Sequence, residues 1–237
     1  FGTRVYIFNH YQRADNPVQH PMTKIFHDMA ISMDEGRALG EINVTRIMRN
    51  KDAKPTEPYP AAAKEGDEYR QFQTLDPGYG VVYWAARHIF YFIPDTMMRP
   101  VMLQLFLDAL ILFALYFTFY RWGWWPAVAA GALYSLNIVF AHSAAVPWYY
   151  FWDGAVCVIA FIGILKLYRA AGEDDPPRLL LILTAVMIGA VLGCGVWIRS
   201  SWFAFAPVLL FACLFSKTLR PWLMYAVLAY ALLAGAM

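Results

Sequence analysis

Apolar residues fill the second part of the chain in long runs, whereas polar and charged residues are spread through the first part. A helix needs about 20 predominantly apolar residues to cross a bilayer. Six apolar runs separated by short polar turns cover residues 100–120, 124–141, 148–168, 179–198, 202–215 and 222–237. The first four are long enough to cross, the fifth is short, and the sixth ends with the sequence. The pattern predicts an all-α, polytopic membrane protein with about six transmembrane helices.

The polar first part, residues 1–98, predicts an extracytoplasmic loop segment with juxtamembrane helices, and residues 99–237 predict the transmembrane helix bundle. Residues 29–49 are expected to form a helix, with Asp28 as its N-cap. Three prolines make residues 51–69 an expected irregular loop. The aromatic stretch 79–92 is too short to span and predicts an interfacial or re-entrant helix.

Basic residues set the expected orientation. If the polar segment and every second loop face one side, the loops of that side hold two basic residues and those of the other side hold six. The positive-inside rule makes the second side cytoplasmic and places residues 1–98 on the extracytoplasmic side, with the bacterial inner membrane as the expected location. The first group is Arg99 and Arg199, and the second is Arg121, Lys166, Arg169, Arg178, Lys217 and Arg220.

Composition narrows the class of protein. The chain has 237 residues, 60% of them hydrophobic, and a formal net charge of +2. Its basic residues are scattered, which excludes nucleic acid as a partner. The three cysteines lie in apolar runs and are expected to act as small hydrophobic residues. Because the sequence starts at Phe1 without a signal peptide pattern and stops inside an apolar run, we expect a piece of a longer protein, incomplete at both ends.

Acidic residues near the membrane are the first candidates for chemistry. A carboxylate close to a low-dielectric boundary can act as a general base toward an acceptor hydroxyl. Asp28 and Glu35 are seven residues apart and would share one face of the expected helix, and Asp34 would lie on a neighbouring face. The alternative is structural: Asp28 caps the helix, and the other carboxylates are solvated charges.

Arg199 interrupts an apolar stretch at the expected outer boundary. An arginine in that place needs an anion, and a lipid phosphate fits a planar guanidinium. The alternative is an arginine that snorkels at a helix end. Two carboxylates in the expected spans, Asp108 and Asp153, also need partners; for Asp108 we favour a structural hydrogen bond or ion pair over a functional role.

Three short motifs resemble the GT-C class of integral-membrane glycosyltransferases, which use polyprenyl-phosphate-linked sugars. Residues 28–33 with 37–39 are similar to the first outer-loop motif of that class. Residues 76–83 resemble its proline-containing aromatic segment, and residues 193–207 resemble a later helix boundary with a basic residue. The chain departs from the class in having 27 polar or mixed residues before Asp28, about half the usual length, and no soluble C-terminal domain.

The resemblance implies an inverting glycosyltransferase that transfers a hexose or pentose from a polyprenyl-phosphate carrier to an acceptor hydroxyl on the outer face. Its implied partners are the lipid-linked sugar, membrane lipids and a glycan, lipid or protein acceptor. By this match Asp28 is the first choice of base and the Asp34–Glu35 pair the second. The candidate substrate contacts are Arg199, Arg99, Asp76, Tyr79 and His142.

Alternatives to this interpretation stay open. No cofactor is indicated, although a divalent cation bound by Asp28 and other outer-loop groups is one alternative. Tyr79 could be an interface anchor, and Asp76 could belong to a turn and nothing more. The competing class of function is a non-catalytic structural or accessory subunit of a larger membrane complex.

Overall fold

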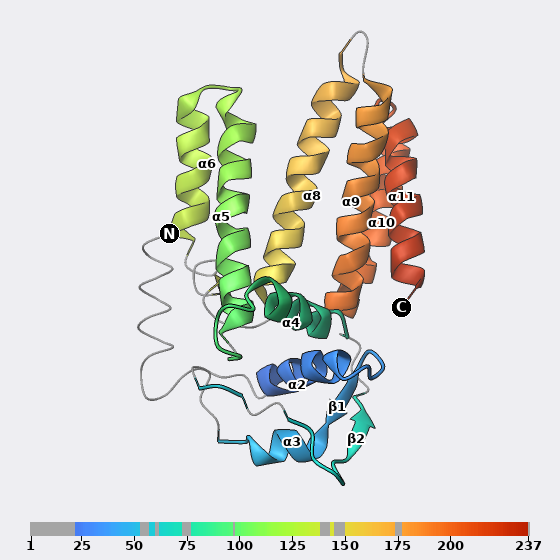
Figure 1. The fold of residues 1–237 in the computed structure, drawn as a ribbon. Coiled ribbons are helices and arrows are strands. Elements are labelled where there is room, and N and C mark those ends of the chain that lie inside the picture. The colour runs from blue at the N-terminus through green and yellow to red at the C-terminus, as the bar shows by residue number, and fades with distance from the viewer. Residues whose placement is uncertain are drawn as a thin grey trace. The chain divides into compact units, whose positions relative to one another are not determined.

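The structure is a computed structural model that describes residues 22–52, 57–59, 62–72, 77–96, 98–137, 143–144, 150–173 and 177–236. It is mostly helical (Figure 1). Its elements in chain order are α2 (Met22–Asp34), β1 (Glu41–Asn43), α3 (Val44–Arg49), β2 (Tyr69–Gln71), α4 (Pro77–Ile89), α5 (Arg99–Tyr120), α6 (Trp124–Leu136), α8 (Tyr150–Ala171), α9 (Arg178–Ile198), the 3₁₀ helix η1 (Ser200–Ala204), α10 (Phe205–Phe215) and α11 (Arg220–Gly235).

Three helices, α5, α8 and α9, are long and apolar enough to cross a membrane. Each coincides with one of the runs expected to span, which is compatible with a membrane protein. The other expected spans correspond to shorter helices: α6 has 13 residues, α10 has 11 and α11 has 16. A total of about six spans and the sidedness of the chain therefore stay predictions.

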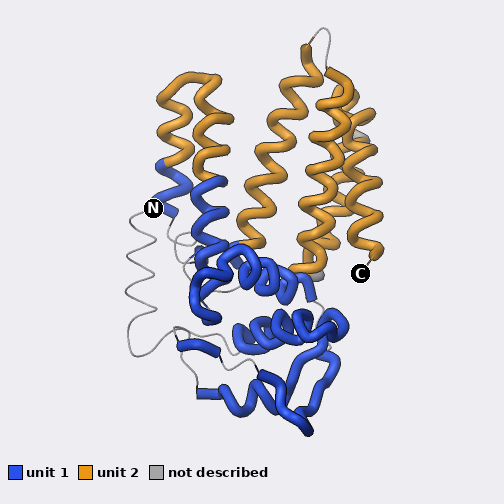
Figure 2. Tube along the Cα trace, in the orientation of Figure 1, with its two compact units in different colours: residues 1–110, 132–151 blue, residues 111–131, 152–237 orange. Residues whose placement is uncertain are grey.

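The chain divides into two compact units, coloured separately in Figure 2. Unit 1 comprises residues 1–110 and 132–151, and unit 2 comprises residues 111–131 and 152–237. The expected division between residues 98 and 99 falls inside unit 1. Each unit has its own buried residues and is described separately.

In unit 1, helices α2 and α4 pack against each other through a close contact at Gly80. A Cβ atom added at Gly80 would lie 2.2 Å from the sulfur of Met29, so a larger residue here would require the Met29 side chain to move. The rings of Phe26, Tyr79 and Tyr83 pack beside this contact, with edge-to-face centroid distances of 4.9 Å (Phe26 to Tyr79) and 5.3 Å (Tyr79 to Tyr83). The face of α2 that carries Phe26 and Met29 is thereby fully buried.

Two short antiparallel strands follow α2, although the sequence analysis predicts no strand: β1 falls in the expected helix 29–49, and β2 starts at the end of the expected loop 51–69. Strands β1 and β2 pair in the register Glu41 with Gln71, Ile42 with Arg70 and Asn43 with Tyr69. The strand residue Ile42 is buried, while Arg70 and Gln71 are exposed. The small sheet fixes the loop after α2 beside the start of α3.

The helix expected over residues 29–49 is wrong, because α2 starts earlier and stops at Asp34. Gly36 adopts a φ of 76°, which residues other than glycine rarely adopt. Its N–H donates to the Met33 carbonyl at 3.0 Å, and the Arg37 N–H donates to the Ser32 carbonyl at 3.0 Å. These two bonds form a Schellman motif, which ends the helix. Asp28 consequently lies in the middle of α2 and is not an N-cap.

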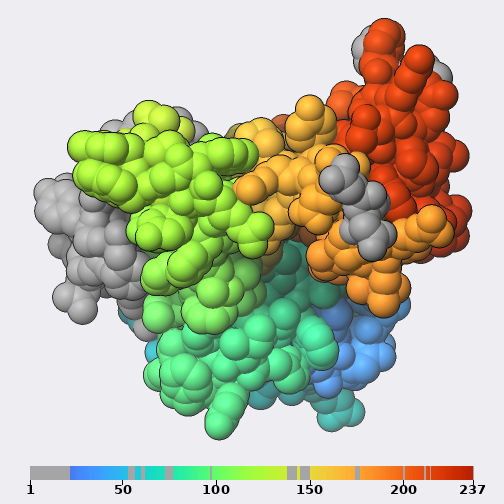
Figure 3. All heavy atoms as spheres, turned by 90° about the horizontal axis from the view of Figure 1, so that it is seen from above, coloured from blue at the N-terminus to red at the C-terminus, as the bar shows by residue number. Residues whose placement is uncertain are grey.

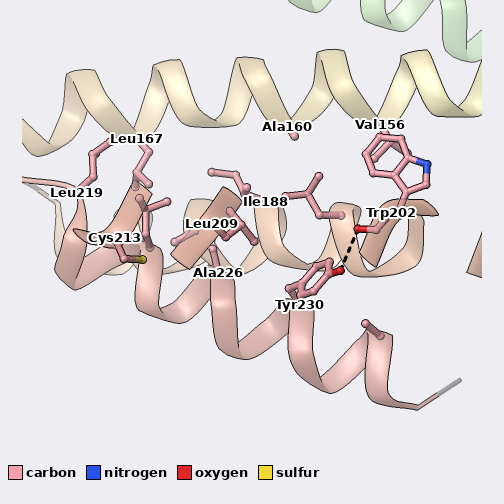
Figure 4. Packing of buried hydrophobic residues seen from close by; sticks show 14 of the residues in the cluster. Val156, Ala160, Leu167, Ile188, Trp202, Leu209, Cys213, Leu219, Ala226 and Tyr230 are labelled. Atoms are coloured by element: carbon pink, nitrogen blue, oxygen red, sulfur yellow. Dashed lines mark hydrogen bonds between the residues drawn. The ribbon is translucent and has the colours of Figure 1, made fainter. Parts of the chain in front are cut away.

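In unit 2, helices α9 and α11 pack through small residues. A Cβ atom added at Gly189 would lie 2.1 Å from the backbone oxygen of Ala226, and one at Gly193 would lie 3.2 Å from that of Tyr230. Side chains from α8, α9, α10, α11 and η1 converge on this contact in Figure 4. The Tyr230 hydroxyl donates to the Trp202 carbonyl at 3.0 Å, which ties η1 to α11.

Candidate functional site

Asp28 forms a fully buried ion pair with Arg46 of α3. The Arg46 Nε donates to Asp28 Oδ1 at 2.5 Å, and neither side chain is exposed to solvent. The backbone N–H of Asn43 donates to Asp28 Oδ2 at 2.6 Å, so both carboxylate oxygens accept a hydrogen bond. Burial raises the pKa of Asp28, and the bonds from Arg46 and Asn43 oppose that rise. The pair joins α2 to the start of α3.

Arg46 also holds Glu35, the second expected acid. Its Nη1 donates to Glu35 Oε1, and its Nη2 donates to the Ser32 hydroxyl at 3.1 Å. The Tyr69 hydroxyl donates to Glu35 Oε2 at 2.8 Å. Burial lowers the pKa of Arg46, but the hydrogen bonds to the two carboxylates outweigh burial and raise it. Asp28 and Glu35 therefore do come together, through a shared arginine that the sequence interpretation did not single out.

Asp34 belongs to a second, more exposed cluster with α4. Arg87 Nε donates to Asp34 Oδ2 at 3.0 Å, and Arg87 Nη1 donates to Asp95 Oδ2 at 2.5 Å. The other oxygen of Asp34, Oδ1, lies 3.6 Å from His88 Nε2 and accepts no hydrogen bond from the described residues. The side chain of Asp34 is 29% exposed and that of His88 is 54% exposed.

The orientation of His88 follows from the helix that carries it. His88 Nδ1 lies 2.9 Å from the Trp84 carbonyl oxygen, one turn earlier in α4. A carbonyl only accepts, so Nδ1 carries a proton, and Nε2 is the ring nitrogen that lies toward Asp34. The ring of Trp84 lies against His88 with a centroid distance of 4.4 Å. Asp34, His88 and Trp84 thus form one partly exposed polar and aromatic surface.

His27 lies on the buried face of α2 in a neutral state. Burial and the positive charges of Arg87, Arg99 and Arg46 lower its pKa to about 3. Within the part of the chain that is described, neither ring nitrogen has a hydrogen-bond partner, and Asp95 Oδ1 is 3.7 Å from Nε2. The imidazole therefore behaves as a buried uncharged ring with two unsatisfied nitrogen atoms.

Tyr79 and Arg99, both expected to contact substrate, lie inside unit 1. Tyr79 has no exposed surface and is packed between Phe26 and Tyr83. Arg99 donates from Nε to the Ile93 carbonyl at 3.0 Å, and its Nη1 lies 3.4 Å from Asp95 Oδ1. The guanidinium of Arg99 therefore has its partners among residues close to it in the sequence.

Arg199 is paired with Asp153 in unit 2. Arg199 Nη1 donates to Asp153 Oδ2 at 2.8 Å, and Trp202 Nε1 donates to Asp153 Oδ1 at 2.7 Å. Both oxygens of Asp153 are thus occupied, and the side chain of Arg199 stays 39% exposed. Arg199 and Asp153, two of the three charged residues that stand out in apolar runs of the sequence, are thus each other's partners.

Asp108 accepts a hydrogen bond at 2.7 Å from the hydroxyl of Tyr134, within unit 1. This bond agrees with the structural role favoured for Asp108. Asp76 and His142 lie outside the described residues. In the described ranges, no three His, Cys, Asp or Glu side chains gather closely enough to hold a metal ion.

The residues that sequence reasoning missed are Arg46, Arg87, His88 and Asp95. A buried acid in an apolar helix face requires a cation, and Asp28 is flanked by buried residues such as Met29 and Ile31. That signal predicts that Asp28 has a cationic partner but does not identify Arg46.

No family model matches the chain, and no curated protein and no solved structure matches it.

Proposed function

We propose that the chain is a membrane glycosyltransferase that moves a sugar from a polyprenyl-phosphate carrier to an acceptor hydroxyl, with Asp34 as the general base. One observation carries this choice among the candidate acids. Asp34 is partly exposed and keeps Oδ1 without a hydrogen bond from the described residues, whereas both oxygens of buried Asp28 are occupied. A base must reach the proton that it abstracts.

In the proposed reaction, the oxygen of the acceptor hydroxyl attacks the anomeric carbon of the sugar. Its proton passes to Asp34 Oδ1 while the bond between the anomeric carbon and the phosphate oxygen breaks, and the electron pair leaves with the polyprenyl phosphate. Arg87 holds Asp34 Oδ2 at 3.0 Å and so fixes the direction of Oδ1. Base catalysis of this kind contributes about 10²- to 10⁴-fold.

Asp28 and Glu35 have a positioning role in this proposal. Their shared partner Arg46 ties the end of α2 to α3, and Asp34 is the last residue of α2. A stable helix end is needed because a base misplaced by about 1 Å can lose about 100-fold in rate. That Arg199 binds a phosphate stays a prediction; its side chain is 39% exposed and pairs with Asp153.

The test is sugar transfer from a panel of polyprenyl-phosphate hexoses and pentoses, measured as release of polyprenyl phosphate. We expect Asp34→Asn to reduce turnover by about 10²-fold or more. Glu68→Gln is the matched control, because Glu68 is an exposed carboxylate of the same unit that pairs with Arg70. Full turnover by Asp34→Asn would refute Asp34 as the base.

A second candidate function is a non-catalytic subunit of a membrane complex. The observation that favours it is the internal pairing of Asp28, Arg99 and Arg199, the groups that the sequence assigns to chemistry. Donor binding separates the two functions. An enzyme binds a polyprenyl-phosphate sugar saturably and in competition with polyprenyl phosphate, whereas an accessory subunit shows no such binding.

A further inference from the structure

The turn between α5 and α6 is held in a defined conformation. The Trp122 N–H donates to the Phe119 carbonyl and the Gly123 N–H to the Tyr120 carbonyl, both at 2.9 Å. Gly123 has a φ of 119°, which favours glycine. The ring of Trp122 packs against Phe119 with a centroid distance of 5.2 Å. The backbone at Arg121 and Trp122 is therefore fixed.

The end of α8 meets this turn through a cation–π contact. The guanidinium carbon of Arg169 lies 5.3 Å from the centroid of the Trp122 ring. Lys166 precedes Arg169 by three residues and so shares its side of α8. Because α5 and α8 are both long and apolar enough to cross a membrane, their joined ends lie at the level where a bilayer would meet water.

Cations and aromatic rings are exposed together at this end. Arg121, Lys166 and Arg169 are exposed, and no carboxylate of the described residues pairs with them. The exposed rings are those of Trp122, Trp124, Trp125 and Tyr168. Figure 3 views the molecule from above, toward this end, with the yellow-green atoms of α6 and the yellow-orange atoms of α8 open to view.

This combination has a specific chemistry. An arginine stacked on an indole keeps the N–H groups in its plane available, and those groups match the oxygens of a phosphate. Indole rings prefer the headgroup level of a bilayer. A free phosphate would need only the cations, but four exposed aromatic rings favour a ligand that brings a lipid interface with it.

We propose that Arg121, Lys166 and Arg169, with Trp122, bind the phosphate of an anionic phospholipid headgroup. The site does not depend on the proposed transfer reaction, because it lies in unit 2 and uses none of the candidate acids. Its expected effect is a preference for anionic over zwitterionic lipid. Each cation contributes about five-fold to that preference.

The experiment compares lipids retained by the protein in nanodiscs of phosphatidylcholine and phosphatidylglycerol, measured by native mass spectrometry. The wild-type chain should retain phosphatidylglycerol above its share in the disc. R121Q/R169Q removes two of the three cations and should reduce that enrichment about 25-fold. R37Q/R70Q is the matched control, because Arg37 also lies over an aromatic ring, that of Tyr69, at 4.1 Å.

Equal enrichment in wild type and R121Q/R169Q would overturn the proposal. So would an equal loss in the control, because the preference would then follow the total charge. Displacement of phosphatidylglycerol by inorganic phosphate would assign the site to a soluble anion instead. Enrichment that survives inorganic phosphate and is lost only in R121Q/R169Q would support a phospholipid site.

Discussion

The buried histidine of α2 gives a pH dependence whose size follows from the structure. His27 has an ordinary pKa of 6.5, and in the folded chain its pKa is about 3. Between these values the unfolded state binds one more proton than the folded state. The contribution of neutral His27 to the free energy of unfolding is therefore fully present above pH 6.5. Below that pH the free energy of unfolding falls by about 1.4 kcal/mol for each pH unit. Acidification from pH 6.5 to 5 should cost about 2 kcal/mol.

Hydrogen exchange of the α2 amides measures this effect as the free energy of opening the helix. In the wild type the free energy of opening should decrease with acidification. In His27→Gln the slope of this free energy against pH should be smaller by about 1.4 kcal/mol per pH unit, the contribution of one proton. His88→Gln is the comparison variant, because it makes the same substitution at a histidine whose side chain is 54% exposed. Carboxylates contribute equally to all three proteins, so the comparison isolates His27.

An unchanged slope in His27→Gln would refute the assignment of a neutral, buried imidazole. If His27→Gln does not fold, an NMR titration of wild-type His27 provides the same information. The ring should remain neutral throughout the range from pH 7 to pH 5. Titration with a midpoint near 6.5 would contradict the reasoning, because it would place the ring in contact with solvent.

Two further substitutions test the packing and the ion pair. Asp28→Asn should destabilise unit 1 by up to about 3 to 5 kcal/mol, because it leaves buried Arg46 with one of its two carboxylate partners, Glu35; adding Arg46→Met should cost less than the sum of the two changes. Thermal unfolding in detergent measures both, and additive costs would contradict a direct pair. Gly189→Ala should lower the melting temperature by several degrees, because its Cβ meets the Ala226 carbonyl, while Gly235→Ala, with open space around it, should not. Equal melting temperatures for the two alanine variants would contradict the close helix contact.

Local patterns were enough to predict most helices. The apolar runs at residues 100–120, 148–168 and 179–198 coincide with α5, α8 and α9, because a long apolar run has few alternatives to a helix. The aromatic stretch 79–92 likewise contains most of α4. The failure at residues 29–49 came from Gly36, whose role as a helix stop depends on the two Schellman hydrogen bonds.

The partners of the charged residues could not be predicted in the same way. Asp153 and Arg199 were both recognised as unusual, yet they are 46 residues apart and meet only after α8 and α9 pack. Arg46 was not singled out in the sequence, because its burial depends on the packing of α3 against α2. Ion pairs of this kind are properties of the tertiary structure.

The central claim is that Asp34 acts as the base of a sugar transfer, and the most direct measurement separates donor binding from turnover in Asp34→Asn. The claim predicts that the variant binds a polyprenyl-phosphate sugar as tightly as the wild type, while the rate of transfer falls about 10²- to 10⁴-fold. A transfer rate equal to that of the wild type, at equal donor affinity, would contradict it.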